Sequence, residues 1–308
     1  MTTRPHESDL VVLGVDGSAA NLGALRFAVA EARRLGTGLK LVHVVPDYLS
    51  IAPMVPLTAA EFTETGTEIL RSAEAIAREL APDLEVDGWL HHGNRPAELL
   101  RAAQGARVLV VGRDGRPLPQ RLLHGDTAAG VAARAQLPVV EVPAEWQPRP
   151  DDAEPVVVVG VKASAHASEL LDDAFAVAAE RQAALVVLHA WKLPTAYDDI
   201  VESRVAVDQW RQEATVEMEG LLRPHREAHP DVKVEVRIVH DRPGHALAEA
   251  SHEADLVVVV RRAHGVPPSI HLGSTARTVL RTAACPVRVV APVTAPREKH
   301  PATPTEGE

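Results

Sequence analysis

The sequence predicts an α/β protein made of two tandem, doubly wound (Rossmann-like) domains, each a mostly parallel five-stranded sheet with helices on both faces. Its 308 residues are enough for two domains of about 150 residues each. The chain also repeats itself: Gly125 and Gly273, in matching segments, are 148 residues apart, and so are Pro138 and Pro286. Within each copy, short Val and Leu runs alternate with long Ala-rich stretches, which is typical of strands connected by helices.

The repeat sets the predicted domain boundaries. Segments that begin at Leu10, His92 and Leu123 match segments that begin at Pro155, His240 and Leu272, in the same order. We therefore predict a first domain at residues 8–143 and a second at residues 155–292. The sequence around residues 144–154 is proline-rich (PAEWQPRPDDAEP), which predicts an exposed, fairly stiff linker. Residues 293–308 are polar and proline-rich, which predicts a disordered tail.

The elements of the first domain follow one another as strand and helix. Strands covered on both faces are predicted from nearly continuous apolar runs at Leu10–Val15, Leu39–Val45, Val108–Val111 and Val139–Val142. Helices are predicted from apolar residues at helical spacing in Ala19–Leu35, Ala59–Leu80 and Thr127–Ala135. Strands of this kind form a parallel sheet, and such sheets bind ligands at the carboxyl ends of their strands. The loops at those ends are therefore where function is expected.

Composition excludes several classes of function. Lys plus Arg number 32 and Asp plus Glu number 42, a net charge of −10 without clustered like charge, so neither nucleic acid nor a membrane surface is an expected partner. With no apolar run of about 18 residues and no secretory signal, we expect a cytoplasmic protein. The single cysteine, Cys285, is expected to be a buried, inert thiol. The 15 histidines do not form a recognisable metal-ligand set, and no nucleophile and base are placed together, so neither a metal site nor an enzyme is predicted.

Two loops of the first domain carry glycines. The first, GVDGSAANLG, does not match GxGxxG, and no GxxxxGK[ST] occurs in the chain. The loop after the fourth predicted strand contains Gly112, Gly115 and Gly125, followed by Asp126 and Thr127 at the start of a helix. Glycines let backbone amides approach phosphate oxygens without a Cβ in the way. Because arginines, Arg113 among them, add positive charge, this loop is a candidate phosphate-binding loop.

These motifs resemble the ATP-binding members of the universal stress protein family. Those members carry Gly, two residues, Gly, nine residues, Gly and then Ser or Thr after the fourth strand, an Asp after the first strand and a His-Val pair in the second. The matching residues here are Asp16, His43 and Val44, Gly112, Gly115 and Gly125. The resemblance covers both copies and implies a tandem member of the family, in which the last strand of each copy, Val139–Val142 and Val287–Val290, pairs with the other.

The resemblance also implies an ATP site in the first domain. Asp16, with Gly17 and Ser18 in the same loop, would contact the nucleoside, and the Val44 backbone would read the adenine edge. The phosphates would be held by Gly112, Arg113, Gly115, Gly125, Asp126 and Thr127. Asp126 departs from the family's Ser or Thr, and its carboxylate repels phosphate unless Mg²⁺ lies between them. We therefore expect weakened or Mg²⁺-dependent ATP binding.

The second domain departs further from the pattern. Lys162 replaces the Asp, and Val260 and Ala263 replace the first two glycines, so a side chain is expected to obstruct the phosphate site. Ser274 and Thr275 are retained, and Lys162, Arg261 and Arg262 make the mouth cationic. We expect a weaker or silent site that could still take an anion in another way.

Simpler interpretations of the same residues remain open. Asp16 could serve only to hold the turn at Gly17 and Ser18, the loop glycines could be turn residues, and Asp126 could be a helix N-cap. The leading function is an ATP-binding tandem universal stress protein with a regulatory or stress-resistance role, forming an intramolecular pseudo-dimer and able to form a homodimer. The alternatives are a nucleotide-independent interaction scaffold of the same fold and a slow ATP hydrolase.

Overall fold

The computed structural model describes most of both predicted domains. The described residues are 9–19, 21–46, 58–113, 127–150, 152–162, 167–192, 207–261 and 272–292, with the backbone alone for residues 207–209. Gly115, Gly125 and Asp126 of the candidate phosphate loop lie outside the described residues. So do Arg262 and Ala263 of the second domain and the predicted tail at 293–308.

The first domain alternates strands and helices. Its elements are β1 (Val11–Gly14), α1 (Asn21–Leu35), β2 (Leu39–Val45), α2 (Ala59–Leu80), β3 (Val86–His92), α3 (Arg95–Ala102), β4 (Val108–Gly112), α5 (Thr127–Ala132) and β5 (Val139–Val142). The four strands located from apolar runs are present, and the helix predicted to end at Ala135 ends at Ala132. The apolar pattern did not locate β3, because most of its residues are exposed or half-buried.

The second domain repeats this order. Its elements are β6 (Val156–Gly160), α6 (Ala167–Glu180), β7 (Ala184–Trp191), α8 (Val207–Ala228), β8 (Val234–His240), α9 (Pro243–Ala250), β9 (Leu256–Val260), α10 (Ser274–Thr282) and β10 (Val287–Val290). Because each element has a counterpart in the first domain, residues of the two domains can be compared position by position. No helix in the described part of the chain is both long and apolar enough to cross a membrane.

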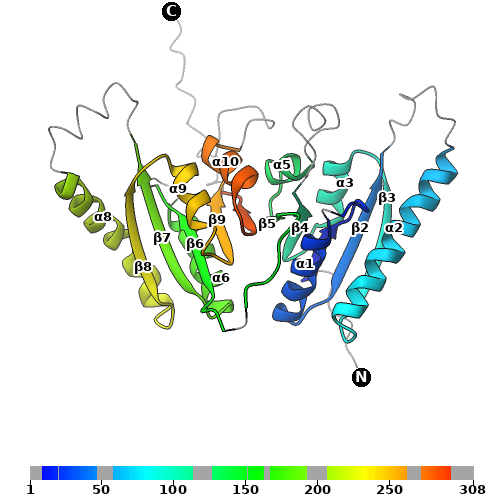
Figure 1. The fold of residues 1–308 in the computed structure, drawn as a ribbon, viewed down its shortest axis with the longest axis horizontal. Helices are drawn as coiled ribbons and strands as arrows, with labels where there is room; N and C mark the ends of the chain where they lie inside the picture. The colour runs from blue at the N-terminus through cyan, green and yellow to red at the C-terminus, as the bar shows by residue number, and fades with distance from the viewer. Residues whose placement is uncertain are drawn as a thin grey trace, which may run out of the picture.

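All the strands lie in one ten-stranded sheet, in the order β3-β2-β1-β4-β5-β10-β9-β6-β7-β8. Neighbouring strands are parallel within each half, so each half is the predicted five-stranded parallel sheet. The halves join where β5 and β10 pair antiparallel, with Val139 opposite Val289 and Glu141 opposite Val287. The internal pairing of the two last strands is therefore confirmed. Figure 1 shows the two halves of the molecule side by side, with β5 on the side of the first half that faces the second.

Helices cover both faces of this sheet. Residues of α1, α2, α6 and α8 pack on one face, in a core that runs through both domains. Residues of α3, α5, α9 and α10 pack on the other face. Val, Leu and Ala fill these cores, as the low aromatic content predicts. Cys285 belongs to the second core, and burial raises the pKa of its thiol to about 12, so it is buried as predicted and protonated at neutral pH.

Most described residues of the linker are exposed, as predicted, but Trp146 is half-buried. Its ring packs edge-on against Phe27 of α1, with 5.5 Å between the ring centroids. The linker begins directly against α1 at Gly23, where a Cβ would lie 2.7 Å from the Pro143 carbonyl oxygen. The prediction treated proline and charge as signs of exposure, whereas the single aromatic residue fixes the linker to the core.

Charged side chains join the two domains beside the sheet, in what we call the seam cluster: Glu31, Arg34, Glu180 and Arg181. Glu31 of α1 accepts hydrogen bonds from Arg34 at 2.7 Å and from Arg181 of the second domain at 2.6 Å. Burial alone would raise the pKa of Glu31, but the hydrogen bond from Arg34 and the charges of both arginines outweigh it and lower this pKa. Glu31 is therefore an ionised carboxylate buried between the domains.

Candidate functional site

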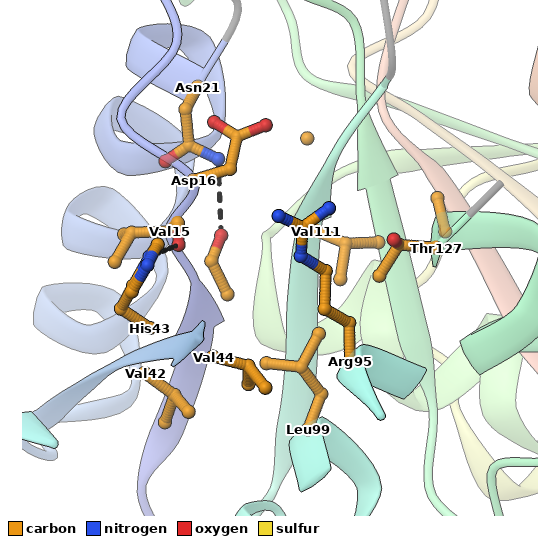
Figure 2. Close-up of a pocket in the computed structure, with 13 residues that line it drawn as sticks. Val15, Asp16, Asn21, Val42, His43, Val44, Arg95, Leu99, Val111 and Thr127 are labelled. Atoms are coloured by element: carbon orange, nitrogen blue, oxygen red, sulfur yellow. Dashed lines mark hydrogen bonds between the residues drawn. The ribbon is translucent and has the colours of Figure 1, made fainter. Parts of the chain in front are cut away.

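A cavity opens at the carboxyl ends of β1, β2 and β4 in the first domain. Strand order reverses between β1 and β4, and parallel sheets place ligand sites at such reversals. The cavity has an empty volume of about 630 Å³, which includes the solvent space at its open mouth. It is lined by Gly14, Val15, Asp16, Asn21, Val42, His43, Val44, Arg95, Leu99, Val111, Gly112, Thr127 and Ala128 (Figure 2).

Asp16 lies at the cavity in a turn that its own side chain stabilises. Its Oδ1 accepts hydrogen bonds from the Ser18 amide at 2.9 Å and the Ser18 hydroxyl at 2.7 Å. Gly17 has φ +77°, a conformation that favours glycine, and a Cβ there would lie 2.7 Å from Ile69 Cγ1. The turn function is therefore present, and the exposed carboxylate also borders the cavity.

The Val44 backbone is directed toward the ligand side of the sheet. The Val42 carbonyl accepts a hydrogen bond from the Val15 amide at 2.9 Å, at the point where β1 ends. Backbone groups two residues apart on a strand point the same way. The N–H and C=O of Val44 therefore point past the end of β1, where an adenine edge could pair with them.

His43 is a fixed, neutral imidazole beside Val44. Its Nδ1 lies 2.8 Å from the Val15 carbonyl oxygen, and because a carbonyl only accepts, Nδ1 carries the proton. Burial lowers the pKa of His43, and the positive charge of Arg95 lowers it further. The ring thus holds the end of β1 against β2 without bringing a charge to the cavity.

The phosphate end of the predicted site is placed in part. Gly112 at the end of β4 and Thr127 at the start of α5 both line the cavity with Asp16. The structure does not bring Arg113 to this cavity. Its guanidinium Nε donates to Glu141 at 2.9 Å, and its Nη1 donates to the Ala283 carbonyl of the second domain at 2.7 Å.

Arg95 is the cation that the structure places in the cavity instead. Figure 2 shows its guanidinium between Asp16 and Thr127. Sequence reasoning missed Arg95 because it follows the exposed edge strand β3 and belongs to no motif. A search for basic residues directly after every strand could have found Arg95. The carboxyl ends of parallel strands all lie at the same edge of the sheet, where the ligand site is expected.

The lining chemistry suits an adenine nucleotide better than a bare metal ion. Val44, Leu99 and Val111 form an apolar wall for a base, with one carboxylate and one guanidinium at the open end. Among the described residues, no group of three His, Cys, Asp or Glu side chains is placed to hold a metal.

The second domain keeps one end of this arrangement. His189 Nδ1 lies 3.0 Å from the Val161 carbonyl oxygen, at the same 28-residue separation as His43 and Val15. The Val161 amide donates to Leu188 as the Val15 amide donates to Val42. The backbone frame beside the base position is thus present in both domains.

The other end differs. Lys162 follows β6 where Asp16 follows β1, and Pro243 begins α9 where Arg95 begins α3. Val260 packs against the core on the α6 face of the sheet. The expected steric obstacle at Val260 is therefore not what the structure shows, because strand alternation turns this side chain away from the α9 and α10 face.

Comparisons with known proteins agree with the fold. A family model described as the universal stress protein family matches residues 8–143 and 155–291. Universal stress protein Rv2005c of Mycobacterium tuberculosis is 30% identical over 295 residues, which are 93% of this chain and 98% of that protein. Universal stress protein Rv1996 of the same organism is 28% identical over 300 residues, covering 91% and 94%. A crystal structure of a universal stress protein from Archaeoglobus fulgidus superposes with a TM-score of 0.67 at 17% identity, covering 93% of this chain and 97% of that one.

Proposed function

Because the chain belongs to the universal stress protein family, we propose that its first domain binds ATP and that the protein is a regulator rather than an enzyme. Occupancy of this site would bias the conformation or the choice of partner, in a stress-resistance role. The second domain would bind nucleotide weakly or not at all, because Lys162 and Pro243 stand where the first domain has Asp16 and Arg95.

One observation carries the proposal. Asp16, the Val44 backbone, Gly112 and Thr127 come from four separate places in the sequence and line a single cavity. A turn-only function for Asp16, or for the glycine Gly112, would not require them to share that cavity.

The same cavity supports binding more than hydrolysis. Asp16 Oδ1 is engaged by Ser18, and the His43 ring packs toward Gly66 of α2 with its Nδ1 held by the Val15 carbonyl. Among the described lining residues, the cavity therefore has no general base beside Gly112 and Thr127. Mg²⁺ would come with the triphosphate, neutralising phosphate charge, and Asp16 is the described carboxylate of the cavity that could contact it.

Thermal unfolding of the whole chain with millimolar Mg-ATP tests the proposal against the scaffold alternative. A ligand at 100 times its Kd adds about 2.7 kcal/mol of stability, so the unfolding temperature should rise clearly. The rise should be lost in Asp16→Ala and kept in Lys162→Ala, the matched change in the second domain. No rise in the wild-type protein would favour the scaffold. Phosphate release that disappears in Asp16→Ala would instead favour the hydrolase.

A further inference from the structure

Arg95 is held at the cavity by the way α3 begins. Asn94 is the N-cap of this helix, and its side chain accepts a hydrogen bond from the Ala97 amide at 3.2 Å. Pro96 follows in the first turn, where its fixed φ favours the helix. The backbone at Arg95 is therefore well defined, and its side chain reaches between Asp16 and Thr127 (Figure 2).

Arg95 is half-buried but has no ion pair with any residue that the structure describes. Arg101, six residues along the same helix, is instead paired with Glu98 and mostly exposed. The Asp16 carboxylate at the cavity is already bound to Ser18. The guanidinium lines the cavity and its charge is not taken up by a carboxylate of the described residues, so it is available to a negatively charged group that enters the cavity.

We propose that Arg95 contacts the phosphate nearest the ribose and makes this pocket select adenosine phosphates over adenosine. This inference rests on the proposed function and adds the group that reads the phosphate. The sequence predicted that Arg113 supplies the positive charge at the phosphates, and the inference assigns this charge to Arg95 of α3 instead. Arg113 bonds to Glu141 and to Ala283 of the second domain. A guanidinium can form two parallel hydrogen bonds with a phosphate, and a neutral nucleoside offers it no such partner.

The second domain provides an internal contrast. Pro243, at the position of Arg95, has neither a charge nor a side-chain donor. The base end of the second domain matches the first in its backbone hydrogen bonds. If Arg95 reads the phosphate, the second domain has no arginine at the equivalent first position of the helix, because its arginine, Arg242, is the exposed N-cap one residue earlier.

Calorimetric titration of the whole protein with adenosine, AMP and Mg-ATP tests the inference. Arg95→Gln should weaken AMP and ATP binding at least about tenfold, a loss typical of one charge-assisted contact, and leave adenosine within about twofold. Arg95→Lys should fall between wild type and Arg95→Gln, because it keeps the charge but not the paired donors. The control Arg101→Gln on the same helix should change none of the three affinities.

The outcomes separate this inference from the proposed function. Wild-type binding of AMP that Arg95→Gln leaves unchanged would overturn the selectivity of Arg95 and leave the ATP site standing. Equal losses for adenosine and AMP would also overturn it, because they would show a structural effect on the pocket. If the wild-type protein bound none of the three ligands, the proposed function and this inference would both fail.

Discussion

The two domains share the backbone frame where the second strand passes the first, and they differ in the side chains at the mouth of the cavity. In both, a histidine on the second strand holds the carbonyl at the end of the first strand, and the second strand continues past that point. Only the first domain adds Asp16 and Arg95 at the mouth. Under the proposed function, the backbone frame of the fold alone would not make a nucleotide site, and particular side chains in two loops would also be needed.

The domains also differ where they face each other. Arg34 and Glu180 occupy equivalent positions on α1 and α6, and they lie 3.4 Å apart across the seam. In a symmetric pair of first domains, Arg34 would face a second Arg34, which is repulsive. Glu31 likewise has Val177 as its counterpart in α6. The seam cluster therefore favours pairing of unlike domains.

The largest effect should come from removing the carboxylate of the seam cluster. Glu31→Gln leaves Arg181 and Arg34 without their buried partner and should lower the free energy of unfolding by about 3 kcal/mol. Urea unfolding measures this loss. Glu180→Gln is the control, because Glu180 is more exposed and should cost about 1 kcal/mol or less. If the free energy of unfolding of Glu31→Gln equalled that of wild type within error, the stability of the seam cluster would not depend on this charge.

The same carboxylate predicts an acid dependence. Its pKa is lowered from 4.5 in the folded protein, so the unfolded chain binds its proton first as the pH falls. The stability that the Glu31 carboxylate contributes is complete above pH 4.5. It is lost as the pH falls through the lower pKa that Glu31 has in the folded protein. The stability difference between wild type and Glu31→Gln should therefore shrink below pH 4.5.

The next effect concerns the mouth of the first domain. Asp16→Lys copies Lys162, removes the acceptor for Ser18 and should weaken Mg-ATP binding about 100-fold, or about 2.7 kcal/mol. Calorimetric titration measures the affinity. The reciprocal change, Lys162→Asp, should leave ATP binding by the first domain unaltered. If Asp16→Lys bound ATP like wild type, the contrast between the domains at this position would have no functional meaning.

A smaller difference in stability is expected between variants of two arginines, Arg113 and Arg261, each of which bonds to the other domain. Arg113 bonds to Glu141 and Ala283, whereas Arg261 bonds to the Ala133 carbonyl and has no carboxylate partner among the described residues. Burial lowers the pKa of Arg261, because it disfavours the charged form of the guanidinium. Arg113→Met should cost about 2 kcal/mol of stability and Arg261→Met about 1 kcal/mol or less. Equal losses in urea unfolding would contradict this ranking.

The smallest effect should come from the residue after the third glycine. Asp126→Ser copies Ser274 and removes a negative charge beside the phosphates, so Mg-ATP should bind about fivefold more tightly. Asp126→Asn, which keeps the shape, should tighten binding similarly if charge is the cause. Equal or weaker affinity in both variants would exclude repulsion by Asp126.

Much of the fold could be predicted from sequence because its signals are local. Buried parallel strands appear as continuous apolar runs, and the repeat indicated two copies of one domain, whereas the pairing of β5 with β10 was predicted from the family resemblance. Strand β3 gave no such run because it lies at the sheet edge, and α3 is short. Of the residues singled out by the glycine spacing and by the Asp after β1, Gly112 and Asp16 line the cavity, whereas Gly115 and Gly125 lie outside the described residues.

The side chains around the cavity were harder to assign because their directions depend on distant contacts. Arg113 follows Gly112 directly, but Glu141 and Ala283 draw it to the seam. Arg95 carries the charge expected of Arg113 and reaches the cavity from another loop. The Glu31 and Arg181 pair joins residues 150 positions apart without any motif. Such contacts follow from the fold rather than from neighbouring sequence.

The antiparallel junction of β5 and β10 has a consequence for how the molecule behaves on dilution. Both strands belong to one polypeptide, so each meets the other at an effective concentration of the order of millimolar or above. The paired unit therefore persists however scarce the protein is in the cell. Its ratio of one first domain to one second domain is likewise independent of expression level.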